Sequence, residues 1–148
     1  MIVTADTGLV AKLYLLEPDS AQARTIIYGI TAPVLLTAWH ALEVANTFQR
    51  AVFIKAITPA QAQDCWQDFI DDQTAGLFKI VALDHTRLME SAQTLTRKHT
   101  ATIGTRTLDL FHVAAALEMG ADTFLSRDDR QRKAAQAEGL NVLPAVLP

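Results

Sequence analysis

The chain has 148 residues, of which 50% are hydrophobic and 20% charged, with a formal net charge of −3. This length and composition fit one globular domain, residues 1–148, that buries a core without structural metals. The lone Cys65 excludes an internal disulfide, and neither a secretion signal nor a membrane-spanning apolar run is evident, so we expect a soluble cytoplasmic protein with no membrane contact.

The first half of the chain predicts strands that alternate with helices. Apolar runs at 2–5 and 32–38 are typical of short buried strands. Thr58, a proline after it and Gln61 form a capping-box pattern at a helix start. Helices are expected at Leu9–Leu15, from Asp19 or Ser20 to Tyr28, at Trp39–Ala56 and from Thr58 to Asp72.

The second half continues the alternation. Strands are expected at 77–83, 122–126 and 140–144. Helices are expected from Asp84 or Thr86 to about Lys98, from Thr105 or Thr107 to just before Gly120, and at 127–139. This order predicts an α/β fold, a three-layer α/β/α sandwich with a central, mostly parallel sheet.

Two acids stand at the ends of predicted strands. Asp6 ends the apolar run of the first strand, and Asp128 follows the strand at 122–126. A carboxylate buried without a partner costs several kcal/mol or takes up a proton. Because functional crevices form at the carboxyl ends of parallel strands, both acids are candidate site residues.

Asp109 interrupts the segment LDLFHVAAAL, whose other residues are apolar nearly all round, as in a buried helix. One interpretation is a first-turn acid stabilised by the helix dipole, beside a core histidine at His112. That interpretation accounts for Asp109 and leaves the other acids unexplained.

Glu43 belongs to a polar stripe on the helix predicted at Trp39–Ala56. The stripe consists of His40, Glu43, Asn46, Thr47 and Arg50, and runs opposite Ala41, Leu42, Ala45, Phe48 and Val52. A polar stripe is usually a solvated face, so Glu43 taken alone does not indicate a site.

A shared cation explains all four acids together. Several carboxylates within a few ångströms take up protons unless positive charge lies among them. Oxygen ligands without histidine or thiolate suit Mg²⁺ or Mn²⁺ and argue against zinc. One or two such ions support phosphodiester hydrolysis, since they activate water and stabilise a phosphoryl oxygen.

Basic residues concentrate in the last third of the chain. Seven of the thirteen lie there: Arg97, Lys98, Arg106, Arg127, Arg130, Arg132 and Lys133. Taken alone, they fit solvated helix faces better than a binding patch. If a metal neutralises the scissile phosphate of a nucleic acid, the candidates for contacts to the flanking phosphates are Arg106, Arg127 and Arg130.

Four segments, in this order, resemble the PIN-domain family, and in particular the VapC-type toxins of prokaryotic toxin–antitoxin pairs. They are IVTADTGLVAKLYLLEPDS, ALEVANTF, TLDLFHVAAALEMGAD and TFLSRDDRQRKAAQAEGL. The resemblance covers nearly the whole chain. It implies a PIN-like α/β/α fold and a Mg²⁺- or Mn²⁺-dependent endoribonuclease that hydrolyses RNA.

The resemblance also implies roles for individual residues. The family's catalytic and metal-binding acids fall on Asp6, Glu43, Asp109 and Asp128. Thr7 matches a hydroxyl residue that supports the metal site. Asn46 matches an amide that could orient the carboxylate of Glu43.

The fourth acid is open to a second assignment. In the segment LSRD, Arg127 stands where many relatives have an apolar or aromatic residue. Either Asp128 or Asp129 therefore matches the family position. We favour Asp128, because it lies closer to the strand end, and expect Asp129 to cap the following helix.

Relatives of this type imply a homodimer and a VapB-like antitoxin as partners. One alternative is a catalytically silent PIN-like module that binds nucleic acid or protein, and another is an unrelated domain whose acids are caps and surface residues. A haloacid-dehalogenase-like phosphatase is disfavoured, because Gly8 stands where that family has its second acid.

Overall fold

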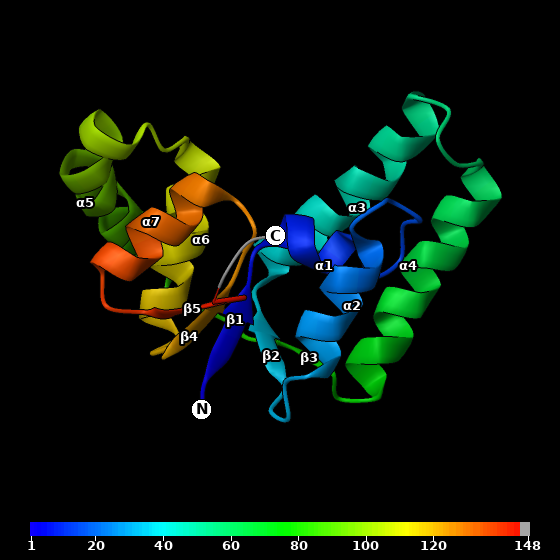
Figure 1. The fold of residues 1–148 in the computed structure, drawn as a ribbon, viewed down its shortest axis with the longest axis horizontal. Helices are drawn as coiled ribbons and strands as arrows, with labels where there is room; N and C mark the ends of the chain where they lie inside the picture. The colour runs from blue at the N-terminus through cyan, green and yellow to red at the C-terminus, as the bar shows by residue number, and fades with distance from the viewer. Residues whose placement is uncertain (146–148) are drawn as a thin grey trace. The chain divides into compact units, whose positions relative to one another are not determined.

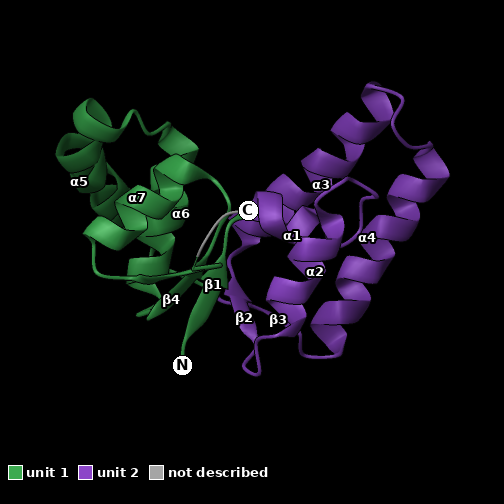
Figure 2. Ribbon diagram, in the orientation of Figure 1, with its two compact units in different colours: residues 1–6, 82–148 green, residues 7–81 purple. Residues whose placement is uncertain are grey.

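The computed structural model describes residues 1–145. The chain forms two compact units, and Figure 2 colours them separately. Unit 1 consists of Met1–Asp6 and Ala82–Pro148, and unit 2 of Thr7–Val81. Folding of the whole chain as a single domain stays a prediction.

Unit 1 contains three parallel strands and three helices within the described residues. Its elements are β1 (Val3–Ala5), α5 (His85–Ile103), α6 (Thr107–Glu118), β4 (Thr123–Leu125), α7 (Asp129–Ala137) and β5 (Asn141–Leu143). Strand β4 pairs with β1 on one side and β5 on the other, with Ala5 opposite Leu125 and Leu125 opposite Leu143.

Helix α6 is the centre of the unit 1 core. Every residue from Asp109 to Ala116 is buried, as the apolar sequence predicts. Four consecutive small residues, Val113 and the alanines at 114–116, have no solvent exposure. Because small side chains let backbones approach closely, α6 packs tightly with α5 and α7, which lie beside it in Figure 1.

Unit 2 contains two parallel strands and four helices. Its elements are α1 (Thr7–Ala11), α2 (Ser20–Tyr28), β2 (Val34–Leu36), α3 (Ala38–Phe53), α4 (Pro59–Thr74) and β3 (Phe78–Ile80). Val34 pairs with Phe78 and Leu36 with Ile80. The aromatic side chains of Tyr14, Phe48, Phe69 and Phe78 meet in its core.

The capping box predicted at the start of α4 is confirmed. The backbone N–H of Gln61 donates to the Thr58 hydroxyl at 3.1 Å, and the Thr58 N–H donates to the Gln61 side chain at 2.8 Å. Helix α3 also begins with a capping box, in which the side chain of a histidine takes the place of glutamine. There the Thr37 N–H donates to Nδ1 of His40 at 3.1 Å.

The polar stripe of α3 is solvated at Asn46 and Arg50, as the pattern predicts, but not at His40. His40 is fully buried, whereas Leu42, which the pattern placed on the apolar face, is 58% exposed. The buried face instead consists of His40, Val44, Phe48 and Ala51. The pattern failed because it took His40 for a solvated residue, although its ring completes the helix cap.

Two helix boundaries also differ from the prediction. Helix α1 begins at Thr7 and ends at Ala11, earlier than the predicted Leu15. Helix α5 continues past Lys98 to Ile103 and ends where Gly104 adopts a left-handed conformation, with φ of 73°. Glycine tolerates this conformation without steric cost, so it ends the helix.

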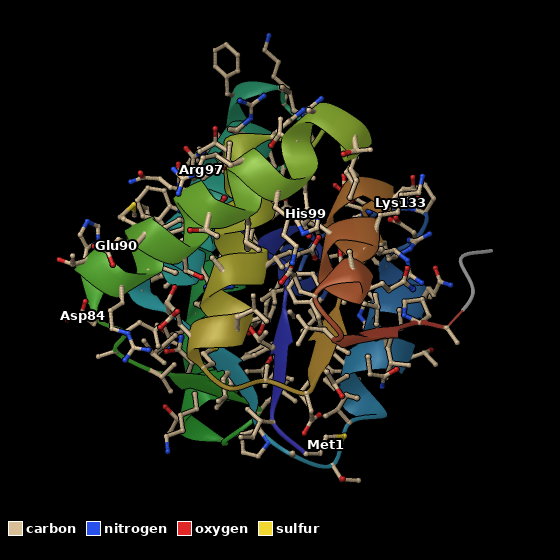
Figure 3. The ribbon with its side chains drawn as sticks, turned by 90° about the vertical axis from the view of Figure 1, so that its left-hand side faces the viewer. Met1, Asp84, Glu90, Arg97, His99 and Lys133 are labelled. Atoms are coloured by element: carbon tan, nitrogen blue, oxygen red, sulfur yellow. The ribbon has the colours of Figure 1, made fainter. Side chains whose placement is uncertain are left out.

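The end of α5 is joined to the end of α7 by a half-buried carboxylate. Figure 3 shows His99 on α5 pointing toward α7. Oε1 of Glu138, the residue that ends α7, lies 2.5 Å from Nε2 of His99 and 2.7 Å from Nζ of Lys98. Burial raises the pKa of Glu138, but the hydrogen bonds from Lys98 and His99 outweigh it and leave the pKa below its ordinary value.

Within the described residues, no helix is long and apolar enough to cross a membrane.

The Glu138 contact predicts a pH-dependent contribution to stability. Because the folded pKa lies below the unfolded one, the contribution is complete above about pH 5 and disappears as the pH falls toward 3. We expect Glu138→Gln to lower the free energy of unfolding at pH 7, and this difference to shrink between pH 5 and pH 3 in urea titrations. Glu90→Gln, on the exposed face of α5, serves as the control. A difference that stays constant or grows on acidification would contradict the assignment.

Candidate active site

The carboxyl ends of β1 and β4 bring Asp6 and Ser126 together. The pairing of the two strands continues one residue past β1, since the N–H of Asp6 donates to the Leu125 carbonyl at 2.9 Å. Ser126 follows Leu125, and its hydroxyl lies 3.2 Å from Oδ2 of Asp6. Parallel pairing thus places the first predicted acid at the carboxyl edge of the strands, where ligands commonly bind in α/β sheets.

Ser126 is fully buried, and its hydroxyl contacts three other residues. Its hydroxyl oxygen accepts the N–H of Asp128 at 3.1 Å and lies 2.9 Å from Oε1 of Gln131. A hydroxyl carries one proton, so Ser126 donates either to Asp6 or to Gln131 at any moment. The serine therefore links the residue after β1 to the start of α7.

Gln131 extends this network to Asp109. Its amide Nε2 lies 3.5 Å from Oδ1 of Asp109, at the outer limit of a hydrogen bond. This orientation of the amide is the favourable one, because the reverse would place its carbonyl oxygen against an ionised carboxylate. Gln131 is only 6% exposed, so the network is largely shielded from water.

Asp109 also supports the start of α6. Its Oδ2 accepts the backbone N–H of Arg106 at 2.8 Å, and its side chain is buried within the first turn. The helix dipole favours a negative charge there. The interpretation of Asp109 as an acid of the first helical turn is therefore confirmed. In addition, its contact with Gln131 connects the same carboxylate to the Ser126 network.

Asp128 and Asp129 have different surroundings. Oδ1 of Asp128 accepts the N–H groups of Arg130 and Gln131, so Asp128 is the N-cap of α7. The expectation that Asp129 caps this helix is wrong: its exposed side chain pairs with Lys133 at 2.6 Å. Capping and the bond from its backbone N–H to Ser126 fix Asp128 beside the network, and its choice over Asp129 as the fourth acid of a metal site stays a prediction.

Glu43 lies in unit 2 and has a defined contact there. Oε2 of Glu43 accepts the hydroxyl of Thr7 at 2.8 Å, and Thr7 is the first residue of α1. Asn46 is exposed on the same helix as Glu43. The place of Glu43 beside the other three acids, and the roles of Thr7 and Asn46 at a metal site, stay predictions.

The three candidate arginines differ in their surroundings. Arg130 lies among the acids, with Nε 3.8 Å from Oδ2 of Asp109 and Nη2 3.6 Å from Oδ2 of Asp128. Arg106 is exposed, and Arg127 is half-buried. Their predicted contacts to RNA phosphates stay predictions.

The acids of unit 1 supply the donor types of a hard-cation site, while their assembly into such a site stays a prediction. Asp6, Asp109 and Asp128 offer carboxylate oxygens, and the groups that connect them are a hydroxyl and an amide. Oxygen ligands of this kind are those that Mg²⁺ and Mn²⁺ prefer. Over residues 1–145, no three His, Cys, Asp or Glu side chains lie close enough together to hold a metal ion.

Sequence reasoning missed Ser126 and Gln131. Both carried a signal: Ser126 is the polar residue at the end of a buried strand, and Gln131 lies three residues after an N-cap acid, where its side chain turns back toward the helix start. Neither sequence feature tells a site residue from an ordinary helix-capping residue, because the partners of these side chains depend on which strand residues pair.

Comparison with protein-family models matches the PIN domain over residues 3–137. The chain therefore belongs to the PIN domain family, which confirms the predicted PIN-like α/β/α fold. PIN domains are generally nucleases. Comparison with curated protein sequences gave no match.

Two solved structures share this fold over nearly their full length. FitAcB from Neisseria gonorrhoeae is 16% identical, with a TM-score of 0.61 over 95% of this chain and 96% of that one. VapBC2 from Rickettsia felis, bound to a DNA fragment from its promoter, is 14% identical, with a TM-score of 0.66 over 96% of this chain and 97% of that one.

The buried network predicts that Ser126 is required for stability. We expect Ser126→Ala to lower the free energy of unfolding by roughly 1–3 kcal/mol, because it leaves the half-buried N–H of Asp128 and the buried amide of Gln131 without their common partner. Ser91→Ala, at a partly exposed position on α5, should change it by less than about 0.5 kcal/mol. Equal effects of the two substitutions in urea unfolding would contradict the assigned role of Ser126.

Proposed function

We propose that the chain is a metal-dependent endoribonuclease, the toxin of a type II toxin–antitoxin pair. The observation that carries this proposal is the network of Ser126 and Gln131, which joins Asp6, Asp109 and Asp128 in a chain of the PIN domain family. Carboxylates that approach one another, as we propose these three do when a metal binds, need positive charge among them. A divalent cation would supply that charge.

Asp6, Asp109 and Asp128 would hold one or two Mg²⁺ or Mn²⁺ ions, directly or through water. When bound, such an ion lowers the pKa of a bound water and stabilises charge on a phosphoryl oxygen. The Ser126 hydroxyl lies within hydrogen-bond distance of one carboxylate oxygen of Asp6, and the cap of α7 fixes one carboxylate oxygen of Asp128. These contacts reduce the side-chain freedom lost on binding.

Glu43 would complete the metal shell or orient the attacking water. Its carboxylate is oriented by the hydroxyl of Thr7, which directly follows Asp6 in the sequence. Asn46 is the second candidate for orienting it. Arg106, Arg127 and Arg130 would contact phosphates that flank the scissile bond, because guanidinium groups bind phosphate oxygens in a bidentate manner.

The two structural neighbours support a protein partner. FitAcB and VapBC2 are complexes of a toxin with its antitoxin, and VapBC2 binds promoter DNA. We therefore propose that the chain acts in the cytoplasm as a homodimer and pairs with a VapB-like antitoxin. The catalytically silent PIN-like module, which would bind nucleic acid or protein, is the alternative that the following experiment separates.

The proposal predicts RNA cleavage that depends on metal and on Asp128. Metal-stripped protein should cut a pool of transfer and messenger RNA after Mn²⁺ or Mg²⁺ is restored. Asp6→Asn and Asp128→Asn should reduce the rate by roughly 100-fold or more, since each removes a proposed ligand worth several kcal/mol to the transition state.

Asp129→Asn is the matched control, because it removes the same charge from the neighbouring residue on the exposed side of α7. Its rate should stay within about twofold of the native rate. Manganese binding without cleavage of any RNA would favour the silent module. Loss of activity in Asp129→Asn instead of Asp128→Asn would reverse the assignment of the fourth acid.

A further inference from the structure

Arg130 places a positive charge of the chain itself between two of the proposed metal ligands. It lies in the first turn of α7, with Nε 3.8 Å from Oδ2 of Asp109 and Nη2 3.6 Å from Oδ2 of Asp128. The oxygens it approaches belong to two different elements, the first turn of α6 and the cap of α7. One guanidinium therefore neutralises a pair of carboxylates that the fold holds together.

The contacts of Arg130 are those of an exchangeable counter-ion. Both distances exceed normal hydrogen-bond length, and a third of its side chain is exposed. Arg132, two residues later, is different: it is 6% exposed and donates to the carbonyls of Ser126 at 2.8 Å and Pro144 at 2.6 Å. Arg132 is fixed by the backbone, whereas Arg130 can turn outward on its long stem.

A divalent cation and this guanidinium cannot both lie against the same oxygens. Like charges a few ångströms apart repel each other even at a partly exposed site, and a guanidinium group carries a positive charge in proteins. The positive charge of Arg130 must therefore move away before or while a metal binds to Asp109 and Asp128.

We propose that Arg130 is the built-in counter-charge of the acidic site: it neutralises Asp109 and Asp128 in the metal-free protein, is displaced when a divalent cation binds, and thereby weakens metal affinity. This inference rests on the proposed function, because it takes the metal to bind these carboxylates. Arg130 acts here as a positioning residue that tunes the site in the absence of RNA.

The test is manganese binding without RNA, measured from the free Mn²⁺ signal in electron paramagnetic resonance. Arg130→Gln and Arg130→Met should bind Mn²⁺ on the order of tenfold more tightly than the native protein, because the competing charge is gone. Arg130→Lys, which keeps the charge, should stay near the native affinity. Lys133→Gln is the matched control, since it removes one positive charge from the exposed side of the same helix and should change the affinity by less than about twofold.

A second measurement uses the unchanged protein. On titration with Mg²⁺, the Nε–H signal of Arg130 in nuclear magnetic resonance should shift at the metal concentration that saturates the site, while that of Arg132 stays in place. Native or weaker Mn²⁺ affinity in both neutral variants, together with an unmoved Arg130 signal, would overturn the inference while leaving the metal site intact. Absence of Mn²⁺ binding in every variant would overturn the proposed metal site itself. Binding that emerges only in the neutral variants would support the inference.

Discussion

The candidate site depends on one buried hydroxyl, that of Ser126. Parallel pairing of β1 with β4 places this residue beside Asp6, and the start of α7 places Asp128 and Gln131 around it. A serine at this position lets residues from a strand end and a helix start share one hydrogen-bond network with no water between them. The strand register and the α7 cap therefore determine the site together.

Two of the three candidate site acids in unit 1 have a structural role as well as a proposed catalytic one. Asp109 accepts the Arg106 N–H at the start of α6, and Asp128 caps α7. In each case one carboxylate oxygen satisfies the backbone, while the other faces a polar side chain, Gln131 or Arg130. Helix starts favour negative charge, so the fold holds these acids in place before any cation binds. Arg130 then balances the charge that the two caps bring together.

Much of this arrangement could be predicted from the sequence, because strand alternation, the Thr58 capping box and the position of Asp6 after β1 follow from local patterns. The buried face of α3 could not be predicted, because His40 completes a helix cap and is buried at a position that helical periodicity assigned to solvent. The roles of Ser126 and Gln131 could not be predicted from the sequence for a different reason. Their partners lie far away in the sequence, so their roles depend on strand register and side-chain conformation.

The central claim is that Asp6, Asp109 and Asp128 together bind a hard divalent cation. The most direct test is a crystal of the protein soaked in Mn²⁺, with an anomalous difference map calculated at the manganese absorption edge. The account predicts a peak within roughly 2–2.6 Å of oxygens from at least two of these carboxylates, or bridged to them by water. A well-ordered map with no peak at these acids, or with manganese bound only elsewhere on the surface, would contradict it.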